Sequence, residues 1–189
     1  TPQLRGLEVN PQLMRSETKK GEEMKLELKK IKVCKWASEE THCYQATLYR
    51  DGVPIIEVSN DGHGGSDSQW AIKPFENNIV DEVEDWCKKN LPKWKGHNNE
   101  MYDTDLEIWC NEQVNKHLVE KDLQRSFKKD LKNKILFVEN DKLMQFTWKK
   151  CKELTSQHFE YFKSKYPKRD ILNLKNKDLA FKLYKKHMI

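Results

Sequence analysis

The chain has 189 residues, of which 37% are apolar and 34% charged, with a net charge of +5. Six Trp, six Tyr and seven Phe supply large apolar side chains for a core. No apolar run reaches the ~18 residues of a membrane span, and no signal peptide is visible. The five cysteines are odd in number and lack a C-x-x-C pair. These features argue against a membrane protein, a disulfide framework and a zinc finger, and they predict a cytoplasmic protein with reduced thiols and no cofactor.

The first 98 residues are predicted to form a flexible arm followed by a β-meander and a helix. Residues 1–23 hold two prolines, two glycines and mixed charge, which is typical of an arm. Alternating apolar residues then predict three antiparallel strands, at 26–36, 43–49 and 53–59. An apolar helical face follows, with Asn77 or Asn78 as its cap and Pro92 at its end.

Local signals refine this meander. Asp51-Gly52 is a strong two-residue hairpin turn between the second and third strands. A register shift is expected near Lys29–Lys30. Pro54 lies near the start of its strand and cannot donate a backbone hydrogen bond, which is tolerated if that strand lies at an edge of the sheet.

The remainder of the chain predicts a long helix, a second hairpin and two further helices. "TDLE" at Thr104–Glu107 matches a capping box and opens a helix of about thirty residues. A hairpin turning at Asn140-Asp141 comes next, before helices at 155–167 and 176–188. The fold class is therefore α+β. We expect domains at 24–98 and 99–189, which could also form one continuous domain.

One polar stretch is a candidate ligand- or partner-binding loop. Its backbone N–H groups could form a nest for phosphate or carboxylate, with His63 as a charge-switchable donor. It matches neither nucleotide-binding glycine motif and contains no lysine. The plain alternative is a strand-to-helix connection that needs glycine for its backbone geometry. The residues are Ser59, Asn60, Asp61, Gly62, His63, Gly64 and Gly65.

A metal-dependent phosphoesterase is a weaker alternative for the same loop. Asp61, His63 and Asp67 have carboxylate and imidazole side chains that could hold a divalent ion. Hydrolytic metal sites need three or more ligands and an open position. This trio is the only contiguous set, so we assign neither metal ligands nor catalytic residues.

Charge is distributed unevenly along the chain. Residues 76–107 contain nine acidic residues and four lysines, whereas residues 142–189 contain thirteen basic and four acidic residues. Lysines can neutralise phosphates and interleaved tyrosines can stack on unpaired bases, so the basic third is a candidate for backbone recognition of RNA or DNA. The alternative, to which we give equal weight, is a solvated lysine-rich surface that binds no nucleic acid. The candidate residues are Lys149, Lys150, Lys152, Lys163, Lys165, Lys168, Arg169, Lys182, Lys185 and Lys186.

The stretch Leu28–Gly65 resembles small proteins encoded by bacteriophages and mobile elements. The resemblance lies in Ser38-Glu39-Glu40-Thr41, Cys43, the Asp51-Gly52 turn and Ser59–Gly65. It implies a protein that works by occupying a host component, with counter-defence, including inhibition of RNA-guided nucleases, as one such role.

Together, these signals predict a non-enzymatic interaction protein. Its expected partner is a host protein or nucleoprotein complex that processes nucleic acid, with the basic C-terminal third near RNA or DNA. A module that sequesters a nucleotide at the glycine-rich stretch is the alternative.

Overall fold

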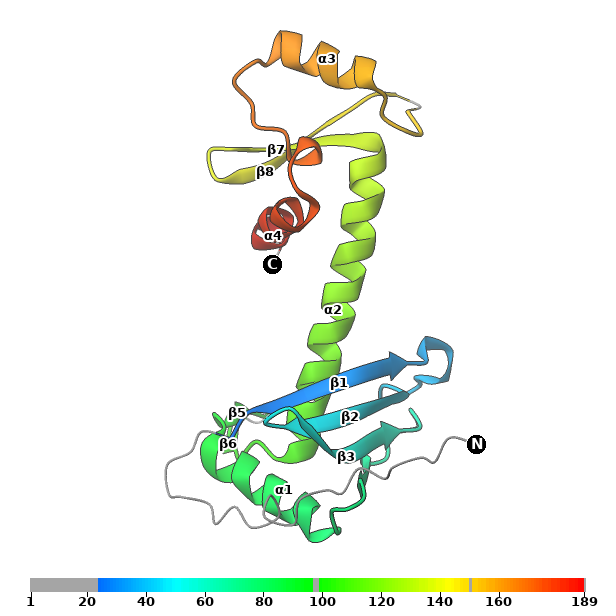
Figure 1. The fold of residues 1–189 in the computed structure, drawn as a ribbon, viewed down its shortest axis with the longest axis vertical. Helices are drawn as coiled ribbons and strands as arrows, with labels where there is room; N and C mark the ends of the chain where they lie inside the picture. The colour runs from blue at the N-terminus through cyan, green and yellow to red at the C-terminus, as the bar shows by residue number, and fades with distance from the viewer. Residues whose placement is uncertain (1–23, 97–98, 150, 189) are drawn as a thin grey trace, which may run out of the picture. The chain divides into compact units, whose positions relative to one another are not determined.

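The computed structural model describes residues 24–96, 99–149 and 151–188 (Figure 1). Within this part of the chain the architecture is α+β, with a four-stranded antiparallel sheet, two two-stranded hairpins and four α-helices. The predicted arm at 1–23 lies outside the described residues. Two compact units divide the chain, the first ending at Trp109 and the second beginning at Cys110.

The four-stranded sheet belongs to the first unit and contains the three predicted strands. Its strands run in the order β1-β2-β3-β4, and every neighbouring pair is antiparallel. The fourth strand was not predicted, because its sequence SQWA is short, has no alternation of apolar residues and follows the glycine-rich stretch. The strands are β1 (Leu26–Val33), β2 (Tyr44–Arg50), β3 (Val53–Asn60) and β4 (Ser68–Ala71).

The turn and the register shift of the meander are confirmed. Asp51 and Gly52 have φ angles of 51° and 84°, the left-handed pair that a type I′ hairpin turn requires. The β1–β2 register shifts between Lys29 and Lys32. β1 ends at Val33, earlier than predicted, because a 3₁₀ turn, η2 (Lys35–Ala37), follows at once.

The strand that contains Pro54 does not lie at an edge of the sheet. β3 lies between β2 and β4, so it is an inner strand. β4 pairs with β3 only from Ile56 onward, where Ile56 faces Ala71. Pro54 therefore precedes the paired part of that edge, and its missing N–H leaves no ladder bond to β4 unmade.

Helix α1 (Asn78–Asn90) contacts β3 and β4 and helps to cover one face of the sheet. Its buried residues are Ile79, Val83 and Cys87, which recur at helical spacing as the sequence predicted. A short hairpin follows, formed by β5 (Trp94–Lys95) and β6 (Met101–Tyr102).

Helix α2 (Leu106–Asn133) begins one residue later than the predicted capping box requires. The Asp105 carboxylate accepts the Ile108 N–H at 2.8 Å and thus caps the helix. The Thr104 hydroxyl instead donates to the Pro92 carbonyl at 2.5 Å. The capping box at Thr104–Glu107 is therefore wrong, because a tertiary contact takes the Thr104 side chain.

The second unit contains the predicted hairpin and both predicted helices. Asn140 and Asp141 have φ angles of 50° and 55°, so the turn is confirmed. The elements after α2 are β7 (Lys134–Glu139), β8 (Lys142–Thr147), α3 (Ser156–Lys165), the 3₁₀ turn η3 (Leu172–Leu174) and α4 (Lys177–Met188).

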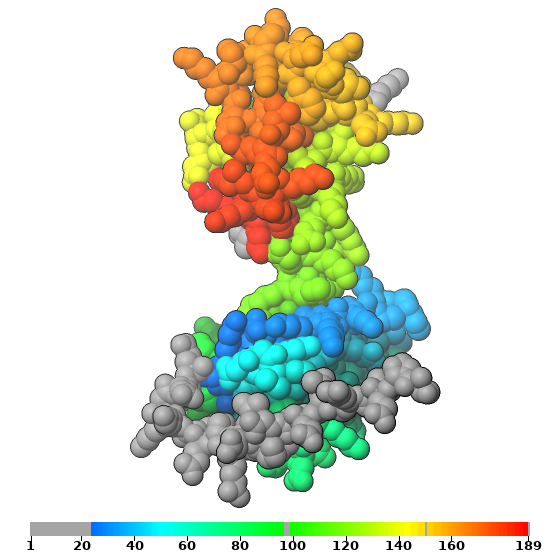
Figure 2. Space-filling view, viewed as in Figure 1, coloured from blue at the N-terminus to red at the C-terminus, as the bar shows by residue number. Residues whose placement is uncertain are grey.

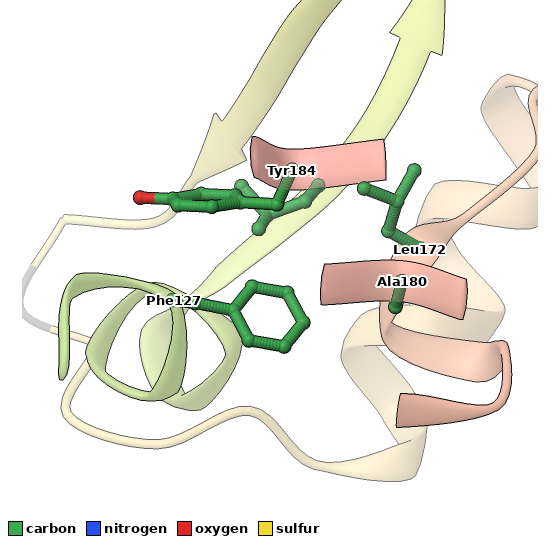
Figure 3. Close-up of a cluster of buried hydrophobic side chains, with 5 residues drawn as sticks. Phe127, Leu172, Ala180 and Tyr184 are labelled. Carbon is green, nitrogen blue, oxygen red and sulfur yellow. The ribbon is translucent and has the colours of Figure 1, made fainter. Parts of the chain in front are cut away.

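Strand β7 is buried on both faces, which explains its unbroken apolar run. Leu136 packs with Phe127 of α2 and Tyr184 of α4 in one cluster, where the Phe127 and Tyr184 ring centroids lie 5.1 Å apart (Figure 3). Ile135 and Phe137 point into a second cluster with Phe162 of α3 and Ile171. Alternate residues of one strand thus serve two small cores.

Candidate functional site

The candidate loop Ser59–Gly65, called the glycine loop below, connects β3 to β4 rather than to a helix. Its centre is Asn60, whose side chain is buried, with 7% exposure. The Asn60 Oδ1 accepts hydrogen bonds from the Thr41 hydroxyl at 2.7 Å and the Gly62 N–H at 2.8 Å. Its Nδ2 donates to the Gly65 carbonyl at 2.9 Å and the Asp67 carboxylate at 3.0 Å. All four contacts lie within the first unit, so Asn60 holds the loop to the body of the protein.

Gly62 sits where no side chain fits. Its φ is +94°, and a Cβ placed there would lie 2.1 Å from the Ala37 carbonyl oxygen. The Gly62 carbonyl accepts the N–H groups of Glu39 and Glu40, both at 3.0 Å, and of Thr41 at 3.3 Å. Glycine is therefore required here for backbone geometry and close approach to the segment between β1 and β2.

The amides of the glycine loop donate mainly to acceptors inside the protein. The Gly62 N–H goes to Asn60, the His63 N–H to the Asp61 carboxylate at 3.1 Å, and the Gly64 N–H to the Thr41 hydroxyl at 3.3 Å. An anion nest needs such N–H groups to converge on free space. The geometry therefore favours the plain alternative of a glycine-dependent turn, although it joins strand to strand.

The possible metal ligands of the loop make separate contacts. His63 Nδ1 lies 3.2 Å from the Glu39 carboxylate at the surface. Asp67 faces the Tyr44 hydroxyl and Asn60. Within residues 24–96, 99–149 and 151–188, no three His, Cys, Asp or Glu side chains gather as a metal site would require.

Burial is the main influence on the pKa of the Asp67 carboxyl. Loss of solvent raises the pKa of this carboxyl, whereas hydrogen bonds from Tyr44 and Asn60 lower it and Asp105 raises it further. The pKa of Glu107 is also raised, first by burial and then by Asp67 and Asp105. Asp67 is hydrogen-bonded to Asn60 of the glycine loop, so once ionised it repels a phosphate bound there, which disfavours a nucleotide site.

An open cavity of about 600 Å³ lies beside the glycine loop. Part of its lining is the face of the sheet opposite the core, including Lys32, Gln45 and Ser59. Cys34 and Cys43 also line it, and both thiols are partly exposed. The sequence pattern did not point to this pair, because the two cysteines are separated along the chain and meet only through strand pairing.

Three of the predicted nucleic-acid-binding residues are engaged within the protein. Arg169 pairs with the Glu139 carboxylate at 2.5 Å, and its guanidinium lies 4.9 Å from the ring centroids of Phe137 and Tyr166. Lys185 pairs with Glu120. Lys186 lies 3.0 Å from the Asp141 carboxylate. These contacts lower the charge available to a ligand.

The other predicted lysines that the structure describes are exposed to solvent. Lys150 lies outside the described residues, and Lys182 is exposed on α4. Five exposed lysines on or beside α3 have no ion-pair partner within the part of the chain that the structure describes. We call this set the basic surface: Lys149, Lys152, Lys163, Lys165 and Lys168.

Aromatic side chains accompany the basic surface. The Trp148 ring lies 4.6 Å from the His158 ring and 6.3 Å from the Tyr161 ring, so the connection before α3 runs beside the helix. Tyr161 and Tyr166 remain 50% and 37% exposed. In Figure 2 the segment containing α3, drawn in orange, forms part of the surface of the second unit.

Neither a protein-family model, nor a curated protein, nor a solved structure matches this chain. The resemblance of Leu28–Gly65 to phage-encoded proteins therefore stays a prediction. Among the described residues, no helix is both long enough and apolar enough to cross a membrane.

Proposed function

We propose that this chain is a non-catalytic interaction protein whose basic surface contacts the phosphate backbone of RNA or DNA in a host nucleic-acid-processing complex. The observation that carries this proposal is the set of five exposed lysines around α3 that lack ion-pair partners among the described residues. Lysines already paired with carboxylates would have to break those pairs before they could bind phosphate. Unpaired lysines release only counterions and water.

The composition of the basic surface favours backbone contact without sequence choice. Arginine forks are the usual readers of guanine edges, and Arg169 is held by Glu139 and two rings. Lysine is a flexible point charge that suits phosphate. The exposed ring of Tyr161 can stack on an unpaired base of any kind. The expected ligand is therefore single-stranded or irregular nucleic acid.

Fluorescence anisotropy with a labelled single-stranded RNA tests the direct contact. The variant Lys163→Ala/Lys165→Ala/Lys168→Ala should bind more weakly and show a slope of log K against log salt that is shallower by about 2, because each single-strand phosphate contact contributes about 0.7. The matched control is Lys185→Ala/Lys186→Ala, which removes two charges that are already paired. Equal losses in both variants, or none in the first, would contradict the proposal.

The partner complex requires a separate test. Affinity purification of the full chain from an expressing bacterial host should retain a protein together with nucleic acid, and the association should weaken steeply with salt. Nuclease treatment before elution separates the two contributions. Retention of the same protein after nuclease treatment, by wild type and triple variant alike, would assign the interaction to another surface.

A further inference from the structure

Cys34 and Cys43 face each other across β1 and β2. Val33 is the partner of Tyr44 in the antiparallel register, so the next pair outward is Cys34 and Cys43. The Cys34 N–H donates to the Cys43 carbonyl at 2.9 Å, which continues the ladder by one bond. Residues directly opposite in such a pair have Cβ atoms about 4.5–5.5 Å apart.

Ser38 completes the pairing of these two residues. Its hydroxyl donates to the Cys34 carbonyl at 2.9 Å and accepts the Cys43 N–H at 2.9 Å. It thus bridges the carbonyl and the N–H that a regular antiparallel ladder would join directly. Both cysteine backbones are therefore held in place while their side chains remain free to react.

Both thiols lie on the same, accessible side of the sheet. Side chains alternate along a strand, and Tyr44 points into the core. Its neighbour Cys43 therefore points to the opposite face, as does Cys34. Both line the open cavity beside the glycine loop and are partly exposed.

The two cysteine side chains also influence each other electrostatically. Its pKa is raised, first by partial burial, then by the nearby Cys34 and Asp61, and by a hydrogen bond with the Cys34 side chain. A disulfide requires Cα atoms about 4.4–6.8 Å apart and Cβ atoms about 3.5–4.5 Å apart. The Cα separation of a hydrogen-bonded antiparallel pair, about 5.5 Å, lies within the first range, and the two Cβ atoms have to approach each other by up to about 1 Å.

We propose that Cys34 and Cys43 form a reversible intramolecular disulfide, with a small-molecule disulfide such as oxidised glutathione as the oxidant. The Cys34 thiolate attacks a glutathione sulfur first, which forms a mixed disulfide and expels one glutathione thiolate; the Cys34 thiol then no longer raises the pKa of Cys43. The Cys43 thiolate then attacks the Cys34 sulfur of the mixed disulfide and expels the second glutathione thiolate. Two protein thiols are oxidised, their two protons pass to the departing thiolates, and one glutathione disulfide is reduced to two glutathiones.

The disulfide would close residues 34–43 into a ring. The enclosed segment includes Glu39, Glu40 and Thr41, whose N–H groups hold the Gly62 carbonyl. Oxidation would therefore pin the segment against which the glycine loop rests. The thiol state would control the rigidity of the cavity beside it.

The other cysteines provide internal controls. Cys87 and Cys110 are buried. The pKa of Cys87 is raised to about 12, mainly by burial, which suppresses its thiolate. Cys151 is partly exposed and lies 3.9 Å from His158 Nε2, so it reports the reactivity of an accessible cysteine outside the pair.

The test treats the full native chain with oxidised glutathione and maps thiols by mass spectrometry after alkylation. The expected product is lighter by two hydrogen atoms and contains a peptide in which Cys34 is joined to Cys43. Cys151→Ser should behave like the wild type. Cys34→Ser and Cys43→Ser should stop at a glutathione adduct on the remaining cysteine.

A trivalent arsenical provides a second test of whether the two thiols lie close together, and this test needs no substitution. Phenylarsine oxide bridges two neighbouring thiols with loss of water, so one equivalent should block Cys34 and Cys43 together in the wild-type protein. Accumulation of separate glutathione adducts on both cysteines of the wild type, with no arsenical bridge, would overturn the proposal. A disulfide that instead joins Cys151 to another chain would do the same.

Discussion

The glycine loop of the first unit and the basic surface of the second use their polar groups in opposite ways. Around Asn60, hydroxyl, amide and carboxylate groups satisfy one another, and Gly62 lets two backbones approach closely. Around α3, lysine side chains end in solvent without carboxylate partners among the described residues. The glycine loop is therefore held by hydrogen bonds within the protein, whereas the lysines around α3 have charge that a partner could contact.

The largest effect should come from the core beneath the basic surface. Phe162 is fully buried on α3, and its ring packs against Phe137 and Phe146. Phe162→Ala should lower the free energy of unfolding by about 3–5 kcal/mol through lost burial and a cavity. Urea denaturation measures this loss.

The neighbouring Tyr161 provides the matched comparison. It is 50% exposed, so Tyr161→Ala should cost less than about 1 kcal/mol in stability. Under the proposed function it should nevertheless weaken binding to single-stranded RNA. Equal destabilisation by the two variants would erase the distinction between core and surface on this helix.

The loss of stability caused by a side chain at Gly62 should come next in size. Gly62→Ala forces a Cβ against the Ala37 carbonyl at a φ that side chains avoid, so we expect a loss of more than about 2 kcal/mol. Gly65→Ala is the control, because a Cβ there meets nothing within 4 Å. Thermal unfolding of the two variants side by side would show whether the close contact at Gly62 stabilises the fold. Two equally stable variants would mean that this contact does not stabilise the fold.

The smallest effect should be a change in pH dependence at Asp67. Burial raises the folded-state pKa of this carboxyl above its ordinary value of 3.8. The unfolded chain therefore ionises first, so this group's contribution to stability is complete at low pH and declines as pH rises from about 4 through the folded-state pKa. Asp67→Asn keeps the shape and removes that ionisation. The stability difference between variant and wild type, measured by urea midpoints across this range, should shift in favour of the variant as pH rises.

Local signals in the sequence were enough for most elements of the fold. The Asp51-Gly52 and Asn140-Asp141 turns follow from residues that tolerate positive φ, and α1 from its apolar spacing. β4 was missed because SQWA carries no apolar alternation and becomes a strand only by pairing with β3. The Thr104 capping box failed for a similar reason, since a distant carbonyl competes for its hydroxyl.

The candidate functional residues also divide into features set by local sequence and features set by tertiary contacts. Residue types and spacing determined where lysines and glycines concentrate, because composition and turn chemistry are properties of short segments. Tertiary structure alone decided which of them are free: Glu139, Glu120 and Asp141 neutralise Arg169, Lys185 and Lys186 from elements distant in the chain. It also decided that Cys34 would meet Cys43, because strand register is set by long-range pairing and burial, which no short stretch of sequence encodes.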